Sequence, residues 1–148
     1  VEVVPENVST VNADTLVSQA DYVASCAPLF PERFALNDAC IAGGKPMVDA
    51  AMFDFDIQLS VYDSTQGPCM RCVYPEAPPE WKRQFPVFGA VSATVGAMAA
   101  AEIIKLIAGI GTPLIGTMLS GDLRNMEFRK MKLRPDPNCN SCGQIVRD

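Results

Sequence analysis

The sequence contains no histidine. A transition metal in this protein would therefore have to rely on sulfur and carboxylate ligands. Basic residues are also scarce, because 12 Lys and Arg stand against 17 Asp and Glu and leave a formal net charge of −5. This balance disfavours nucleic acid as a partner, since affinity for nucleic acid depends on basic residues that neutralise phosphates.

Long apolar runs and targeting segments are missing as well. The most apolar stretch, residues 87–101, is uncharged but short for a membrane span, and it continues into Glu102 and Lys105. The first residues do not have the pattern of a signal peptide. We therefore expect a soluble protein with no membrane partner that works in the cytoplasm, a reducing compartment.

Four of the six cysteines form two C-x-x-C pairs, Cys69 with Cys72 and Cys139 with Cys142. Each pair can aim two sulfurs at one point, and two pairs complete the tetrahedron that a structural Zn²⁺ requires. Disulfides within each pair and an iron site with the same four sulfurs are the alternatives. A shared metal would connect the C-terminal residues to the middle of the chain.

The pattern of apolar residues, prolines and glycines predicts several strands and helices. We expect strands over residues 1–4, 22–26, 46–51, 57–62, 114–119 and 126–133, and helices over residues 15–20, 31–42 and 91–108. Gly43 and Gly44 are expected to end the second helix, and Gly109 the third. A turn is expected over residues 120–122, and the proline-rich stretch 75–86 is expected to be a mobile loop.

This order of elements predicts an α/β protein with one mixed sheet. Strand, helix and strand over residues 22–51 form a βαβ unit, which implies parallel strands. The later strands alternate apolar and polar residues, as half-buried antiparallel strands do. The 148 residues suffice for one domain. The first residue is not methionine, so we expect the segment to come from the interior of a longer protein.

Three stretches have a distinctive form. Residues 67–76 read G-P-C-M-R-C-V-Y-P-E, residues 101–109 read A-E-I-I-K-L-I-A-G, and residues 128–143 begin F-R-K-M-K-L and end C-N-S-C-G. They resemble the G-x-C-Y-R-C-L-F-P-E stretch, the A-x-E-A-I-K-L-L-x-G helix and the F-R-x-x-K-L…C-x-x-C-G ending of the ThiF/MoeB/HesA family of adenylyltransferases. Upstream, Phe30, Arg33 and Asn37 match the family's helix D-N-F-x-x-R-x-x-x-N.

The resemblance implies a Rossmann-like fold and a homodimer that uses ATP and Mg²⁺ to attach AMP to the C-terminus of a small ubiquitin-like or sulfur-carrier protein. It also implies a structural zinc on Cys69, Cys72, Cys139 and Cys142. The family's nucleotide loop belongs to its N-terminal half, and this sequence has no G-x-G-x-x-G. We therefore interpret residues 1–148 as the C-terminal part of a ThiF-type activating domain, inactive alone.

Further departures leave the function open. The family's D-C-T-D-N falls on residues 25–29, where Pro28 replaces the metal-associated aspartate and only Cys26 is retained. Cysteines are also absent from residues 73–138, where some members have a reactive one. The complete protein is then either an adenylyltransferase or a non-catalytic pseudo-enzyme that keeps fold, zinc and dimer for partner binding. A zinc-stabilised module of unrelated fold is a third interpretation.

Several single residues have two possible roles. Cys26 and Cys40 are expected in the core rather than as reactive thiols. Asp21 and Asp49 are expected to be solvated at strand ends; the alternative is that one of them replaces the missing metal carboxylate. Asp54 and Asp56 are expected at alternate strand positions that face water rather than in acid–base chemistry.

The remaining candidates concern binding. Arg33 and Asn37 have two alternative roles, as supports of a nucleotide pocket or as a surface ion pair and a helix-face amide. The alternatives for Arg71 are to offset thiolate charge or to point to solvent. The exposed faces of residues 57–62 and 126–133 are expected to dock the partner, with the loop 75–86 crossing over its tail.

Overall fold

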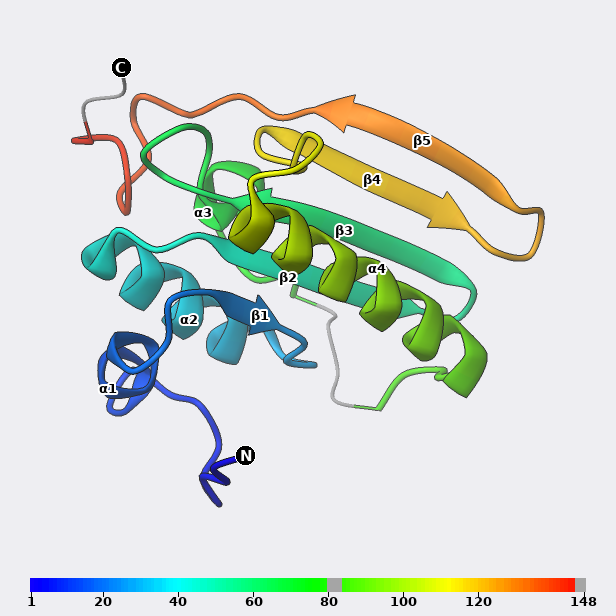
Figure 1. Ribbon diagram of the computed structural model, residues 1–148, viewed down its shortest axis with the longest axis horizontal. Coiled ribbons are helices and arrows are strands. Elements are labelled where there is room, and N and C mark those ends of the chain that lie inside the picture. Colours follow the sequence, from blue (N-terminus) through cyan, green and yellow to red (C-terminus); the bar gives the residue numbers. More distant parts are fainter. Residues whose placement is uncertain (80–83, 146–148) are drawn as a thin grey trace.

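The computed structural model describes residues 1–79 and 84–145. The helices in these residues are α1 (Ala13–Ser18), α2 (Phe30–Gly43), α3 (Met70–Val73) and α4 (Gly89–Ala108). The strands are β1 (Val23–Ser25), β2 (Met47–Phe53), β3 (Asp56–Tyr62), β4 (Thr117–Asp122) and β5 (Glu127–Lys132). Figure 1 shows them as one sheet with helices packed against it.

The sheet is mixed, as the sequence predicts. Its strands lie in the order β1-β2-β3-β4-β5. The pair β1 and β2 is parallel, and the helix between them, α2, completes the predicted βαβ unit. Every later pair of neighbouring strands in the sheet is antiparallel. Within the described residues, β1 and β5 are therefore the two edges.

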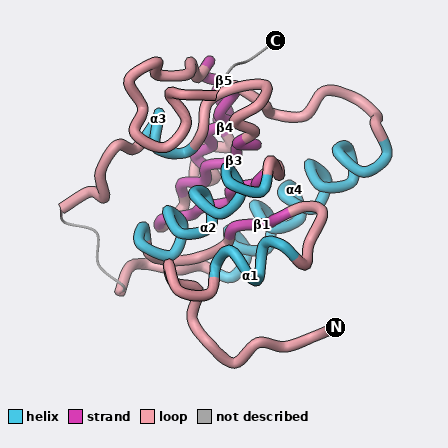
Figure 2. Tube along the Cα trace, turned by 90° about the vertical axis from the view of Figure 1, so that its left-hand side faces the viewer, coloured by secondary structure: helices cyan, strands magenta, loops and turns pink. Residues whose placement is uncertain are grey.

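Two apolar clusters cover the two faces of this sheet. On one face α1 and α2 pack with Met47, Tyr62 and Met70. On the other face α4 packs with Val48, Leu59 and further side chains of β2 and β3. Met47 and Val48 are successive residues of one strand and point to opposite faces, which fixes the helices on opposite sides. Figure 2 shows the strands between α3 and α4.

The predicted alternation of residues 57–62 is only half correct. Ile57, Leu59 and Val61 do face α4. The opposite side chains are not exposed, however, because Ser60 and Tyr62 are also buried. The strand β3 lies in the middle of the sheet, and helices cover both of its faces at this end. Its second face is therefore not available as a docking surface.

Prolines and glycines set the helix ends largely as predicted. Pro31 lies in the first turn of α2, where its missing N–H costs nothing. Gly44 follows α2 with φ of 61° and Gly109 follows α4 with φ of 64°, the left-handed conformation that glycine tolerates best. The first helix runs Ala13–Ser18, two residues earlier than expected.

Two predictions of secondary structure are wrong. Residues 1–4 are exposed and form no strand, because no neighbouring strand in the described residues pairs with them. Residues 120–122 are part of β4 rather than a turn, and the turn follows at residues 123–126. Gly121 is opposite Ile57 and Phe128, and an added Cβ would lie 2.9 Å from each side chain. This glycine therefore lets two large neighbours pack within the sheet.

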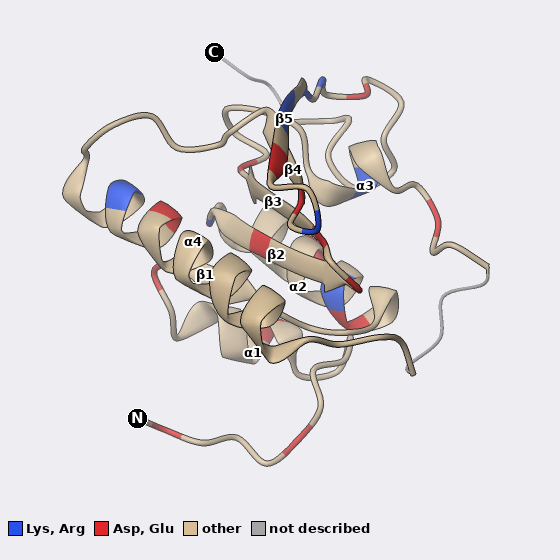
Figure 3. Ribbon diagram, turned by 90° about the vertical axis from the view of Figure 1, so that its right-hand side faces the viewer, with Lys and Arg blue, Asp and Glu red and all other residues tan. Residues whose placement is uncertain are grey.

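Helix α4 is apolar over most of its length. By length and composition alone it could cross a membrane, and 22% of its apolar window is buried in the protein. Its inner face, which includes Val91, Val95 and Ala99, packs on the sheet. Its charged residues are Glu102 and Lys105 near the C-terminal end, which appear as one red and one blue segment of α4 in Figure 3. We interpret α4 as a helix that covers the sheet.

Glu102 connects α4 to the segment before β4. Its side chain is buried, it forms an ion pair with Lys105 one turn away, and it accepts a hydrogen bond from the Leu114 N–H at 2.9 Å. The carbonyl of Leu114 in turn accepts from the Val61 N–H at 3.2 Å. The carboxylate therefore fixes where the chain enters the sheet after the helix.

We expect Glu102→Ala to lower the free energy of unfolding by about 2 kcal/mol, because the buried Leu114 N–H loses its acceptor. Urea denaturation measures this change. Glu127→Ala removes an exposed carboxylate from β5 and serves as the control, with an expected change below about 0.5 kcal/mol. Equal losses in the two variants would contradict this role of Glu102.

Candidate metal centre and neighbouring cavities

The structure brings the four paired cysteines together. Cys69 immediately precedes α3, Cys72 lies within it, and Cys139 and Cys142 lie in the loop after β5. The Sγ atoms are separated by 3.9 Å between Cys69 and Cys72, 3.7 Å between Cys69 and Cys139, and 3.4 Å between Cys72 and Cys142. All four sulfurs lie within 4.8 Å of one another.

These distances fit a tetrahedral metal site. Four sulfurs at about 2.3 Å from a central Zn²⁺ are separated from one another by roughly 3.8 Å. A disulfide would need sulfurs at about 2.05 Å, so the cysteines are not paired in that way. The four side chains could therefore hold a metal ion, with no position left for a substrate. Iron accepts the same ligand set, so these separations do not identify the metal.

The protein environment acts differently on the thiols. Burial raises the pKa of Cys69 and of Cys72. Burial also acts on Cys139, but hydrogen bonds from the backbone at Cys142 and Ser141 outweigh it and lower the pKa of this thiol. A metal ion binds the thiolate, so its binding would release protons from these cysteines.

Backbone contacts shape the loop that carries the second pair. The Asp136 N–H donates to Cys72 Sγ at 3.4 Å, and the Gly143 N–H donates to the Cys139 carbonyl at 2.8 Å. A Cβ at Gly143 would lie 2.6 Å from the Pro137 carbonyl oxygen, which no real side chain tolerates. Glycine at this position is therefore a requirement of the turn that presents Cys139 and Cys142.

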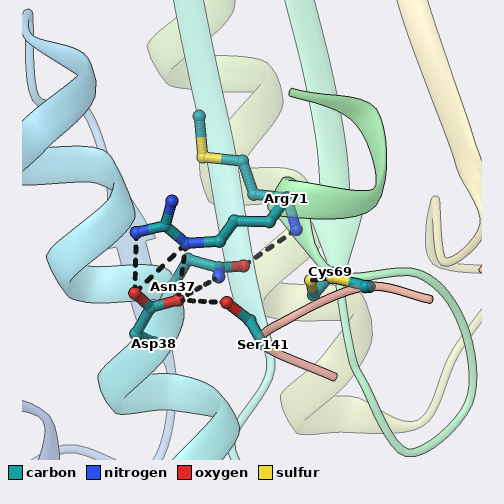
Figure 4. A network of polar contacts seen from close by, with 7 residues as sticks. Asn37, Asp38, Cys69, Arg71 and Ser141 are labelled. Atoms are coloured by element: carbon teal, nitrogen blue, oxygen red, sulfur yellow. Dashed lines mark hydrogen bonds and ion pairs between the residues drawn. The ribbon is translucent and has the colours of Figure 1, made fainter. Parts of the chain in front are cut away.

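A polar network joins the cysteine segments to α2 (Figure 4). Asp38 accepts hydrogen bonds from Arg71 Nε at 3.0 Å and Arg71 Nη2 at 2.8 Å, and from the Ser141 hydroxyl at 3.1 Å. Asn37 donates its amide N–H to Asp38 at 2.9 Å and accepts from the Met70 N–H at 2.8 Å. Arg71 does not simply point to solvent, since its guanidinium is bound to Asp38. The hydrogen bond to Asp38 raises the pKa of Arg71, and the charges of Cys69 and Cys139 act in the same direction, as expected of a cation that offsets thiolate charge.

Asp38 is held in its charged form. Burial alone would raise its pKa, but hydrogen bonds from Arg71, Asn37 and Ser141 outweigh burial and place the pKa below its usual value. The guanidinium of Arg71 also lies over the Phe34 ring, 4.1 Å from its centroid. The network thus contains one full ion pair, a stacked aromatic ring and two neutral donors.

Arg33, which also lies on α2, forms a buried ion pair with Asp49 of β2. Its Nε and Nη2 donate to Asp49 at 3.2 and 2.5 Å, and both side chains are 5% exposed. Arg33 also stacks on Phe30 at 4.7 Å from the ring centroid. Neither a solvated Asp49 nor a surface Arg33 is therefore correct, and Asn37 is buried as well. The pairing leaves Asp49 poorly placed to bind a cation.

Two cavities adjoin Arg33. The first has a volume of about 200 Å³ and lies between the end of β1, β2 and the start of α4. Its lining includes Cys26, Pro28, Met52, Phe85 and Val95, but no carboxylate from the described residues. The second, of about 180 Å³, is lined by Phe30, Phe53, Gln58, Tyr74 and others. Both are largely apolar spaces next to a neutralised guanidinium.

The two remaining cysteines differ from each other. Cys40 is buried as predicted, and burial raises its pKa to about 12. Cys26 is exposed, so the expectation that it packs in the core is wrong. It follows the last residue of β1 and lines the first cavity, where partial burial and the charge of Asp49 raise its pKa.

The other aspartates are peripheral. Asp21 is exposed, as expected. Asp56 is exposed at the start of β3. Asp54 is half-buried in the turn between β2 and β3, with φ of 56°, and binds Arg124 at 2.7 Å. Asp54 therefore does not occupy the regular strand position that was expected.

Sequence reasoning missed Asp38 and Ser141. Both are polar residues beside recognised positions, since Asp38 follows Asn37 and Ser141 lies within a C-x-x-C pair. Arg71 lies between two cysteines, and its guanidinium needs a carboxylate partner if that segment is partly buried. That requirement is the one signal in the sequence that points to an acidic residue nearby.

We expect Cys142→Ser to lower bound metal from about one ion per chain to well below one, because a closed site loses one of its four ligands. The melting temperature should fall with it, since metal binding and folding are coupled. Elemental analysis and a melting curve measure both effects. Cys26→Ser makes the same substitution at an exposed position and should change neither quantity.

We also expect an alkylating reagent at about pH 7.5 to modify Cys26 and to leave Cys40 unmodified in the folded protein. Cys26 is exposed, whereas Cys40 is 3% exposed and its thiol stays protonated. Peptide mapping by mass spectrometry identifies the modified residue. Modification of Cys40 before unfolding would contradict its burial.

Comparison with known proteins identifies the family of this chain. The model of the ThiF family matches residues 1–141. HesA of Trichormus variabilis is 43% identical over 144 residues, which is 97% of this chain and 54% of that protein. The sulfur carrier protein adenylyltransferase of Thermus thermophilus is 37% identical over 152 residues, covering 97% of this chain and 56% of that protein.

The fold has relatives among solved structures. E. coli MccB with ATP superimposes with a TM-score of 0.72 at 18% identity, over 88% of this chain and 43% of that one. This chain thus spans about half the length of the curated relatives that it matches. The mixed sheet fits a Rossmann-like fold, and the match of the family model over residues 1–141 establishes that the chain belongs to the ThiF family.

Proposed function

We propose that residues 1–148 are the C-terminal part of a ThiF-type activating domain and that the complete protein is an ATP-dependent adenylyltransferase. Its substrate would be the C-terminus of a small ubiquitin-like or sulfur-carrier protein, or of a peptide. The observation that supports this most is the 37% identity to a sulfur carrier protein adenylyltransferase over 97% of the chain.

In this proposal the four cysteines bind a structural Zn²⁺. The separations of 3.4 to 3.9 Å between sulfurs support this role, as does the absence of a fifth position for substrate. ATP and Mg²⁺ would be cofactors of the complete protein only. The zinc would hold the loop after β5 against α3.

The surface that meets the carrier would be the strip 126–133. All six residues of β5 are exposed, and Phe128 and Met131 are apolar residues on its two faces. The strip 57–62 is buried except for the half-buried Gln58, which lines the second cavity, so it does not form an exposed docking face. The carrier's tail would then run toward the cavities beside Arg33, past the segment 75–86, of which residues 80–83 lie outside the described part.

A pseudo-enzyme is the second candidate, and the residues around Pro28 favour it. Pro28 lines the first cavity, and proline offers no ligand for Mg²⁺. The Ser25 hydroxyl, which replaces another family aspartate, is buried and has no hydrogen-bond partner among the described residues. Asp49 is already bound to Arg33. The protein would then keep its fold, zinc and dimer for partner binding.

The setting would be the same for both candidates. We propose a homodimer in the cytoplasm, because free cysteines persist in a reducing compartment. The outer side of α4 carries the exposed residues Ile104 and Ile107, which suits burial against another polypeptide.

We expect the full-length protein to exchange pyrophosphate into ATP only when its carrier or peptide substrate is present, because the exchange reports reversible formation of the acyl adenylate. Radiolabelled pyrophosphate and a set of candidate carriers provide the assay. If the protein neither exchanges pyrophosphate nor binds ATP at nucleotide concentrations on the order of millimolar, the pseudo-enzyme is correct instead.

The separate chain of 148 residues is the control. It should consume no ATP, since it has no glycine-rich nucleotide loop of the G-x-G-x-x-G type. Measurable ATP consumption by this segment would show that the interpretation as half of an activating domain is wrong.

A further inference from the structure

One helix contacts both segments that carry the cysteine pairs. Asn37 and Asp38 are successive residues near the middle of α2. Between them they bind Met70 and Arg71, the two residues inside the first C-x-x-C pair, and Ser141, inside the second. The side chains converge on Asp38 in Figure 4, with Cys69 beside them. The two pairs are thus connected twice, through their sulfurs and through α2.

Asn37 supplies a hydrogen-bond acceptor that the first pair cannot provide for itself. Cys69 occupies the capping position of α3, where Ser, Asp or Asn usually accepts from the first N–H groups of a helix. Its side chain makes no such bond and points to the other sulfurs instead. The Oδ1 of Asn37, which is 1% exposed, accepts at 2.8 Å from the Met70 N–H, the first N–H of α3, which a capping side chain at Cys69 would not reach.

Asp38 acts on both sides of the cluster. Its two oxygens receive the bidentate guanidinium of Arg71, a strong and directional contact. The oxygen Oδ1 also receives the Ser141 hydroxyl. Because Arg71 and Ser141 each lie between two cysteines, fixing them on one carboxylate fixes the relative position of the two C-x-x-C turns.

We propose that Asn37 and Asp38 are positioning residues for the metal centre and that they hold both cysteine pairs in the metal-binding arrangement from a helix that provides no ligand. This inference rests on the proposed metal binding by the four cysteines. The residues after β5 bury little of their own surface, so the contact with Asp38 adds to the few backbone contacts and the metal that order them. Residues that orient metal ligands in this way affect affinity by about 10- to 100-fold.

The test uses the full chain loaded with Zn²⁺ or with Co²⁺, whose visible absorption reports a tetrahedral sulfur environment. We expect Asp38→Asn to release metal to a chelator about 10- to 100-fold faster than the unaltered protein and to shift the Co²⁺ spectrum. Glu32→Gln removes a carboxylate from the same helix that makes no ion pair in the described residues, and should leave both unchanged.

Two further measurements separate positioning from general destabilisation. Asp38→Asn should lower the melting temperature of the metal-free protein only slightly, because its ion pair with Arg71 is partly exposed. Ser141→Ala should also speed release, but the double variant Asp38→Ala/Ser141→Ala should be no faster than Asp38→Ala, since Ser141 acts through Asp38. Independent, multiplying effects would overturn the proposal, as would unchanged release from Asp38→Asn.

The outcomes also distinguish this inference from the proposals on which it rests. If the unaltered protein binds no metal, the metal site itself is wrong and the inference with it. If it binds metal and Asp38→Asn behaves identically, only the positioning role is wrong. Pyrophosphate exchange by the full-length protein is measured separately and bears on neither result.

Discussion

The convergence of four sulfur atoms from segments 70 residues apart is the constraint on which the C-terminal part of this structure depends. Between residues 134 and 145 only Cys142 is buried, so this stretch has almost no apolar core of its own. What orders it instead is a set of directional contacts: sulfur to sulfur, the turn that requires Gly143, and the Ser141 hydroxyl on Asp38. A structural metal suits such a segment, because it replaces missing burial with ligand bonds.

Sequence patterns predicted the elements whose cause is local. The apolar face of α4, the glycine after α2 and the βαβ unit follow from periodicity and helix-stop residues, and the structure confirms them. The convergence of the four paired cysteines was also predictable from the sequence, since two C-x-x-C turns are a typical ligand set for one metal ion. The failures share another cause, which is contact between distant segments. Whether Ser60 is buried depends on what covers the second face of β3, and whether Arg71 is solvated depends on Asp38 from another helix.

The buried pair of Arg33 and Asp49 shows how one contact can decide between functions. An isolated buried carboxylate beside a cavity would invite a cation, but a carboxylate already bound by both arms of a guanidinium has little further attraction for one. The cavity beside it is correspondingly apolar, with Pro28 in the wall. Neither Asp49 nor Pro28 therefore offers a free side-chain oxygen to a cation in this cavity.

The order of the strands has a consequence for folding kinetics. Each strand of the sheet pairs with the strand that precedes it in the chain, from β1 through to β5. The hairpins β2–β3 and β4–β5 close short loops and lose little loop entropy, but β3 and β4 are separated by residues 63–116. The sulfur cluster closes a loop of similar length between Cys69 and Cys139. We therefore expect the two hairpins to form before β4 joins β3 and before the C-terminal loop docks on α3.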